Sequence, residues 1–331
     1  MPLCGLFYFS KFLTRDFVKI CVMKTLPDTL HHFLFEDTTS NDKPNYPMPI
    51  RGNLVRLNNT FMQSLQHQTL PTVLKTALGE LMAASALLSA TLKMDGVMVL
   101  QLQSSGALKL LVVECSSDLK MRATAKWDES QTDSLAEQTF FDLIKNGQFV
   151  ITLDPTEGEA YQGIVPIEGE TIAQMLENYM LRSQQIETSL WLHCDETSAS
   201  GLLLQKLPEV APNMVDSDID AWNRVNQLAN TVSNDELQNL SAEILLTRLF
   251  AEENVRLFEP KSTQFYCNCN QGSVASMLRM LGEAELKSIL AEFGQIDVNC
   301  DFCNKHYVFD AVDTAQILAS TATIQMGNAK H

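Results

Sequence analysis

The sequence predicts an α+β protein with a mixed-strand N-terminal core, a helical linker region and a small C-terminal zinc module that has four cysteines as ligands. Three observations carry this prediction. Short alternating apolar segments are separated by turn residues, which is typical of β-hairpins. One long segment, residues 72–93, is apolar on nearly every helical face and is therefore expected to be a buried helix. Four cysteines in two close pairs lie in the last quarter of the chain.

The bulk composition is that of a globular protein of two or three domains. The chain has 331 residues, of which 45% are hydrophobic and 19% charged, and its formal net charge is -16. Such an acidic surface favours solubility and repels phosphate backbones, so general nucleic-acid binding is disfavoured. Of the eight cysteines, the four outside the last quarter are scattered, which indicates a reducing compartment rather than a secreted disulfide scaffold.

Residues 1–25 are interpreted as a disordered or spurious extension, and translation from Met23 is the alternative start. The stretch is apolar, but charges interrupt it before it reaches the length of a signal peptide core or a membrane span. The interrupting residues are Lys11, Arg15, Asp16 and Lys19. No other segment approaches membrane length, so no membrane partner is expected.

The core domain is expected to span residues 26–206. Two strands, 30–35 and 52–57, flank a polar, proline-containing loop at Thr38–Pro49. Pro71 begins the long helix, because its fixed φ suits the first turn, and Asp95-Gly96 ends it with a turn. The later elements are a hairpin of 97–103 with 108–114, strands at 149–153, 161–166, 190–193 and 202–205, and a helix at 169–182. Strands and helices are intermixed, which is the α+β pattern.

Residues 207–258 are expected to form a helical linker. The composition shifts at Pro208–Asp220, which carries prolines and acids but little apolar content. Two amphipathic helices follow, the second one capped by Asn234. Their apolar stripes include Ile219, Trp222, Val225, Leu228, Leu245 and Leu249. Helices of this length are marginal alone, so they need a partner surface.

Residues 259–331 are expected to form the cysteine module, which is small for a self-sufficient core. It is predicted to contain helices from Gly272, at 283–293 and at 310–320, and a small hairpin of 296–298 with 307–309.

The four cysteines of the module are Cys267 and Cys269, then, after 30 residues, Cys300 and Cys303. Two such pairs can present four thiolates to one tetrahedral ion, which is the geometry of structural zinc. A filled sulfur shell leaves no open position for water, so the site is not that of a metallohydrolase. It also leaves little role for His306 as a ligand.

The same sulfurs can close into two local disulfides, after which no sulfur ligand would remain for a metal. Chemistry alone therefore leaves two interpretations open: a permanently structural zinc, and a switch in which oxidation unfolds the module. The isolated Cys115 and Cys194 lie among apolar residues and are expected to be buried and inert.

Two other classes of function remain as alternatives. A constitutive zinc-ribbon module that binds protein or nucleic acid without redox switching is disfavoured, for nucleic acid, by the acidic balance of residues 259–331. An enzyme is disfavoured because the sequence has no nucleophile elbow, phosphate loop or dinucleotide fingerprint. In thiol oxidoreductases CxxC begins a helix, whereas a turn into a strand is expected after Cys303.

The chain resembles the heat-shock protein 33 family, the bacterial 33 kDa chaperonins, over roughly residues 26–320. The matching segments are DTLHHFLFE (28–36), RG (51–52), GELMAAS (79–85), LKMDG (92–96), PTEGEAYQG (155–163), LENY (176–179), RS (182–183) and GLLLQ (201–205). The most specific match is CxC, 30 residues, then CDFCNKHYVF at 300–309. The chain departs from the family in residues 1–25 and in an insertion near Thr38–Pro49.

This resemblance implies a cytoplasmic, ATP-independent holdase that is not an enzyme. Its reduced form would be an inactive monomer with one Zn²⁺ on Cys267, Cys269, Cys300 and Cys303. Oxidation would form Cys267–Cys269 and Cys300–Cys303, release zinc, unfold the linker and module, and give a homodimer that binds unfolded proteins. The client-binding candidates are the linker residues Ile219, Trp222, Val225, Leu228, Leu245 and Leu249, which in the reduced state would pack as ordinary core.

Overall fold

The structure is a computed structural model that describes residues 27–36, 47–132, 135, 138–208 and 220–327. The expectation for residues 1–25 lies outside these ranges, as do most of the loop expected at 38–49 and the client-binding candidate Ile219. The α+β class predicted from the sequence is confirmed. The described residues form two six-stranded sheets and one two-stranded sheet, together with helices.

The first sheet has the strand order β10-β1-β2-β9-β8, with β11 also pairing with β1, and all of these pairs are antiparallel. The strands are β1 (Thr29–Glu36), β2 (Pro47–Leu57), β8 (Thr188–Cys194), β9 (Ala199–Lys206), β10 (Asn254–Leu257) and β11 (Lys261–Ser262). β2 begins at Pro47, inside the segment expected to be loop. β10 and β11 come from segments in which no strand was expected, and both extend the edge formed by β1.

The second sheet has the order β12-β5-β4-β3-β6-β7. Its strands are β3 (Gly96–Gln103), β4 (Leu108–Ser116), β5 (Lys120–Trp127), β6 (Gln148–Pro155), β7 (Tyr161–Val165) and β12 (Gln264–Phe265). The hairpin predicted for 97–114 is therefore confirmed as β3–β4. The pair β12–β5 is parallel, whereas the other pairs are antiparallel.

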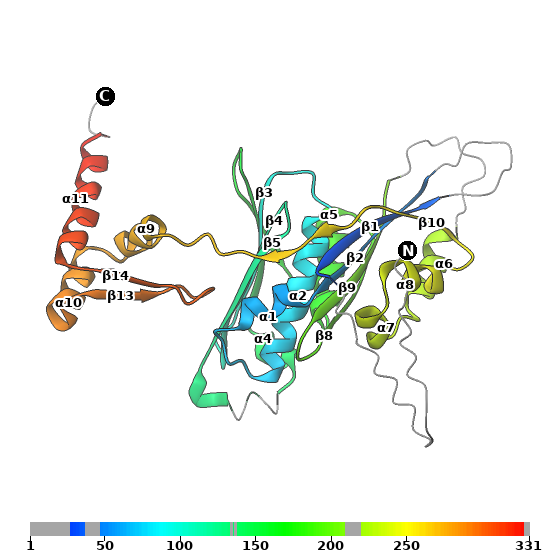
Figure 1. Cartoon of the computed structure of the whole chain (residues 1–331), viewed down its shortest axis with the longest axis horizontal. Coiled ribbons are helices and arrows are strands. Elements are labelled where there is room, and N and C mark those ends of the chain that lie inside the picture. Colours follow the sequence, from blue (N-terminus) through cyan, green and yellow to red (C-terminus); the bar gives the residue numbers. More distant parts are fainter. Residues whose placement is uncertain (1–26, 37–46, 133–134, 136–137, 209–219, 328–331) are drawn as a thin grey trace, which may run out of the picture.

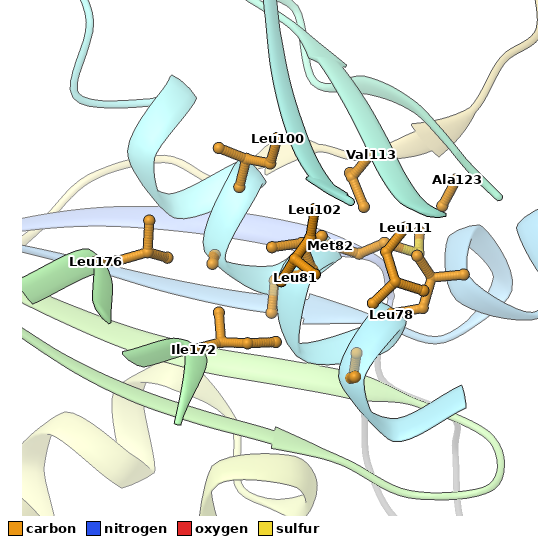
Figure 2. Close-up of a cluster of buried hydrophobic side chains, with 14 of the residues drawn as sticks. Leu78, Leu81, Met82, Leu100, Leu102, Leu111, Val113, Ala123, Ile172 and Leu176 are labelled. Atoms are coloured by element: carbon orange, nitrogen blue, oxygen red, sulfur yellow. The ribbon is translucent and has the colours of Figure 1, made fainter. Parts of the chain in front are cut away.

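Helix α2 (Thr72–Ser89) lies between the two sheets (Figure 1). In Figure 2 its Leu78, Leu81 and Met82 lie against side chains of the second sheet, including Leu102 and Leu111. The predicted burial of this helix is confirmed. It ends at Ser89 rather than Lys93, because the amides of residues 90–92 close the last turn and the chain then reverses at Gly96 (φ 155°), where β3 begins.

The described part of the core also contains the helical segments α1 (Asn59–Leu65), the 3-10 turn Glu129–Gln131, α4 (Phe140–Ile144) and α5 (Ile172–Gln184). α5 begins three residues later than expected, since the hydroxyl of Thr171 accepts the amide of Gln174 and so caps the helix there. Gln185, in the left-handed conformation, ends it.

The outer face of the first sheet is covered by the linker helices α6 (Ala221–Ala229), α7 (Asn234–Asn239) and α8 (Ala242–Leu249). In β9, Leu203 faces the α2 side, whereas Leu202 and Leu204 face the linker helices. Helices on both faces explain why β9 is buried along nearly its whole length rather than alternating.

The second linker helix expected from the sequence is in fact two helices. Ser233, not Asn234, is the N-cap of α7, because it forms a capping box with Glu236. The hydroxyl of Ser241 caps α8 by accepting the amide of Ile244, without a capping box, so the chain turns at Leu240. Serine hydroxyls compete for backbone amides, which makes them helix starts rather than helix interiors.

The C-terminal module contains α9 (Gln271–Leu281), α10 (Glu283–Phe293), the hairpin β13 (Ile296–Asn299) with β14 (His306–Phe309), and α11 (Ala311–Gly327). The elements match those expected, although α11 is longer. Among the described side chains its core cluster has only seven buried hydrophobic residues. Across the described ranges, no helix combines the length and hydropathy needed to span a bilayer.

Glu80 in α2 gives the core a pH-dependent stability. Burial raises the pKa of this carboxyl to about 7 from an ordinary value near 4.5. The unfolded chain therefore loses this proton at a lower pH than the folded core does, and stability falls as the pH rises from 4.5 through 7. We expect Glu80→Gln to stabilise the core by about 1–3 kcal/mol at pH 8, with no gain at pH 4. Urea unfolding followed by hydrogen exchange of the α2 amides measures this, with the exposed Glu157→Gln as control. A gain that is equal at both pH values would contradict it.

Candidate metal centre

The four cysteine sulfurs of the C-terminal module lie within 4.8 Å of one another. Sγ of Cys267 is 3.7 Å from Sγ of Cys300, and Sγ of Cys269 is 3.4 Å from Sγ of Cys303. All four are free thiols. Sulfurs at 2.3 Å from a tetrahedral zinc would be roughly 3.8 Å apart, so the cluster has the dimensions of a tetrathiolate site.

The local backbone explains how each pair of cysteines is presented. Cys267 and Cys269 directly follow β12, and Asn270 then caps α9 through a capping box with Ser273. In the second pair the amide of Cys300 donates to the carbonyl of Lys305, and Asn304 adopts a positive φ of 56°. Each knuckle is thus a short turn between regular elements, with its sulfurs pointing inward.

Three donors outside the cysteines contact the sulfurs. The hydroxyl of Tyr307 donates to Sγ of Cys269 at 3.1 Å, and Nη1 of Arg122 donates to Sγ of Cys267 at 3.5 Å. The backbone amide of Lys305 faces Cys303. Hydrogen bonds to sulfur stabilise the anionic thiolate, as partners outside the ligand shell do in metal sites. The surroundings of the cluster therefore suit four thiolates around a cation.

The residues present fit a structural metal ion. Burial, together with the neighbouring thiols, raises the pKa of Cys303 to about 12, so this sulfur needs a cation to become a thiolate at neutral pH. His306 is not part of the cluster, since its Nε2 lies 2.9 Å from Asp297 on the opposite strand of the hairpin. Soft sulfur donors in a closed shell favour zinc over magnesium or calcium.

The structure places five of the six client-binding candidates at the interface between linker and sheet. Val225, Leu245 and Leu249 are buried in one apolar cluster with Phe33 and Phe35 of β1. The other two candidates, Trp222 and Leu228, are partly buried against the same cluster. In this conformation they form ordinary core and offer no open binding surface.

Cys115 and Cys194 lie apart from the metal centre and are buried, as expected. Burial raises the pKa of each thiol to about 12. Because the thiolate is the reactive form, neither side chain is suited to redox chemistry at neutral pH.

The sequence does not predict β5, the core strand that contacts the C-terminal module. Arg122 lies on this strand, β5 (Lys120–Trp127), and contacts the sulfur cluster, and no strand is expected there from the sequence. A usable signal is present in the sequence: the apolar residues Met121, Ala123 and Ala125 alternate with the polar residues Lys120, Arg122, Thr124 and Lys126, although Thr124 is buried as well. A period of two with a basic outer face is typical of a half-covered strand, but it does not reveal what covers it.

Two sheets around one helix, a helical cover on the first sheet, and a C-terminal cluster of four cysteines define an α+β protein with a candidate structural metal site. The family model described as Hsp33 protein matches residues 28–310, and the chain belongs to the Hsp33 family of chaperones. The resemblance inferred from the sequence is therefore confirmed.

Relatives agree with this assignment, and a solved structure agrees with the fold. The 33 kDa chaperonin of Methylobacillus flagellatus is 52% identical over 92% of this chain and 99% of its own length. The 33 kDa chaperonin of Chromobacterium violaceum is 43% identical over 92% and 98%. The crystal structure of the 33 kDa chaperonin of Thermotoga maritima superimposes with a TM-score of 0.67, 19% identity, and coverage of 88% of this chain and 99% of that one. This last likeness concerns the fold alone.

Proposed function

We propose that this chaperone is a redox-regulated, ATP-independent holdase of the cytoplasm that protects unfolding proteins during oxidative and heat stress. Residues 26–206 would be the core domain for client binding and dimerisation, 207–258 the redox-sensitive linker, and 259–331 the zinc-binding switch. The observation that carries the proposal is the clustering of four cysteine sulfurs in a module with very little core of its own.

In the reduced state, Cys267, Cys269, Cys300 and Cys303 would hold one Zn²⁺. Bound zinc would keep these sulfurs as thiolates and supply on the order of 10–16 kcal/mol of apparent binding energy, as in small structural zinc modules. The seven buried hydrophobic residues of the module are too few to replace it. Folding of the module would therefore depend on the sulfur centre.

Oxidation by a peroxide would remove all four ligands. Each pair of thiolates gives two electrons to one peroxide and forms one S–S bond, while the O–O bond breaks and two protons are taken up to yield two waters. We propose the pairs Cys267–Cys269 and Cys300–Cys303, which are adjacent in sequence. Distances alone do not select them, because all four sulfurs lie within 4.8 Å.

Loss of the module would in turn release the linker. The chain between α8 and Cys267 is held by three short strands, β10, β11 and β12, which pair with the edges of the two core sheets. The helices α6, α7 and α8 are nine, six and eight residues long, which is too short for stability without a partner surface. Unfolding would expose both their apolar sides and the sheet face beneath them.

The uncovered area has the properties of a client-binding surface. It would include Phe33, Phe35 and Leu54 of the first sheet and the linker residues Val225, Leu245 and Leu249. Contiguous apolar patches of this kind bind other apolar chains, including partly unfolded proteins and a second copy of the same protein. Homodimerisation of the oxidised form is part of this proposal.

The test compares one preparation before and after peroxide at elevated temperature. Zinc content, tryptophan fluorescence and suppression of aggregation of a thermally unfolding client are measured together. We expect about one zinc per reduced chain, release of that zinc on oxidation, and holdase activity only afterwards. Zinc retained after oxidation, or equal activity in both states, would instead favour a constitutive zinc module.

A further inference from the structure

The outer face of β5 forms a docking surface for the sulfur centre. Lys120, Arg122 and Lys126 lie on this face, and each contacts the C-terminal segment. Lys120 lies over the ring of Tyr266 at 5.4 Å, and Nζ of Lys126 is 2.7 Å from the carboxylate of Asp301. Lys120 and Arg122 are also paired within the core, with Asp118 and Glu114 respectively.

Arg122 is the residue of this row that contacts both cysteine knuckles. Its Nη1 donates to Sγ of Cys267, which belongs to the first knuckle. Its guanidinium carbon lies 4.2 Å from the ring centre of Phe302, which is between Cys300 and Cys303 in the second knuckle. Arginine is suited to both contacts, because its planar fork can stack on an aromatic ring while it donates hydrogen bonds at its edge.

Glu114 of the neighbouring strand β4 fixes the orientation of this fork. Nε and Nη2 of Arg122 both lie close to Oε2 of Glu114, at 2.8 and 2.7 Å, which leaves Nη1 directed at the sulfur. Both side chains are largely buried, with 18% and 24% of their surfaces exposed. The interaction of Arg122 with a charged sulfur is therefore less screened by water than a surface ion pair.

The charge of the sulfur centre changes on oxidation. Four thiolates around one divalent cation carry a net charge of about −2, whereas two disulfides without metal carry none. We propose that Arg122 is a positioning residue of the metal centre, which clamps the sulfur cluster to β5 only while the sulfurs are anionic. This inference rests on the proposed redox switch and adds that oxidation removes the docking contact itself, in addition to the metal.

Strand β12 links this contact to the core sheets. The amide of Gln264 donates to the carbonyl of Leu119 and the amide of Tyr266 to that of Met121, which places these two bonds within three residues of Cys267. Release of the clamp frees the anchor of β12 and then the segment that returns to the linker. Hydrogen exchange at these two amides is a direct readout of docking.

Arg122→Met tests the proposal in the reduced, zinc-loaded full chain. Methionine keeps the length and the apolar stem but removes the charge and the donors. We expect metal affinity in a chelator competition to fall about 10–100-fold, as for other partners of metal ligands. We expect exchange at the Gln264 and Tyr266 amides to accelerate about tenfold or more, the loss associated with one hydrogen bond to a charged group.

Lys126→Met is the matched control, because it removes the same charge from the same strand and breaks the contact with Asp301 without touching a sulfur. That ion pair is half exposed, so little change is expected. Phe302→Leu removes the stacking partner and should shift both readouts in the direction of Arg122→Met. Arg122→Lys, which keeps the charge, should recover part of the metal affinity.

Equal metal affinity and equal exchange in Arg122→Met and Lys126→Met would overturn the role of Arg122, as would a failure of Arg122→Lys to recover any affinity. Unchanged exchange in β3 and β4 checks that the variant core is folded. If the wild-type protein lacks oxidation-dependent holdase activity, the proposed function fails, while both readouts in the reduced protein still decide whether Arg122 clamps the sulfur centre.

Discussion

Cys303→Ser is expected to abolish stable zinc binding and to open the linker without any oxidant. The Cys303 sulfur lies 3.4 Å from that of Cys269, and serine offers a hydroxyl that stays protonated near neutral pH in place of a thiolate. Loss of a ligand should reduce metal affinity by more than the ~10–100-fold typical of residues that only support the ligands. Because the module has few buried apolar residues, metal loss and unfolding should coincide.

Zinc stoichiometry, hydrogen exchange of α9 and α10, and holdase activity under reducing conditions measure this result. The control is Cys194→Ser, which removes a thiol of the core that is 6% exposed and remote from the sulfur cluster. We expect this control to keep its zinc and its oxidation-dependent activity. A Cys303→Ser protein with full zinc affinity and a protected linker would show that Cys303 is not a ligand.

The clustering of the four cysteines could be predicted from the sequence, because it depends on residue type and spacing. Cys267, Cys269, Cys300 and Cys303 are the only described cysteines outside the core, and two tight turns suffice to present their sulfurs together. The burial of helix α2 could be predicted equally well. A helix that is apolar on all faces is stable only when other elements pack on all of its faces. In both cases local sequence determines the feature without knowledge of distant partners.

The missed elements depend on partners far away in the chain. β10 and β12 are four and two residues long, and they are strands only because β1 and β5 offer free edges. β5 itself mixes charged with small residues, and its outer face contacts both cysteine knuckles, the first of them 145 residues after Arg122. Short strands of this kind have no periodicity of their own to detect.

The break between α7 and α8 has a different cause. The apolar positions Leu237, Leu245 and Leu249 fit one helical stripe, and the periodicity therefore predicted one helix. The hydroxyl of Ser241 accepts the amide of Ile244 and starts a new helix at that point. A turn in the linker lets both helices follow the curved face of the sheet, where Arg56 of β2 donates to the carbonyl of Leu237.

These differences affect how the switch is understood. A linker of three short helices, held between an apolar sheet face and the strands β10–β12, has two separate supports. In the proposed switch, oxidation acts on the second support, through the sulfur centre and its contact with β5. The first support is the apolar contact of the helices with the sheet, and it can be removed by mutation while the metal centre stays intact.

Leu245→Asp is expected to remove that first support and to give a holdase that is active while reduced and zinc-loaded. Leu245 is fully buried against the first sheet, and an aspartate there would lose the packing of a leucine and bury a charge without a partner. Loss of leucine packing alone costs about 2–5 kcal/mol, and the buried carboxylate adds to this. The linker should therefore detach although all four thiolates remain on the metal.

Ile244→Asp is the matched control, because the neighbouring Ile244 on the same helix is 57% exposed. It introduces the same charge without disturbing the interface, so it should behave as wild type. The fluorescence of Trp191 and Trp222 reports detachment, since both side chains pack against this cluster and Nε1 of Trp191 donates to Asn230 of the linker.

If Leu245→Asp detaches the linker with zinc retained yet fails to prevent client aggregation, the surface beneath the linker is not where clients bind. Activity of Leu245→Asp without oxidant, and not of Ile244→Asp, would separate client binding from the redox chemistry that we propose controls it.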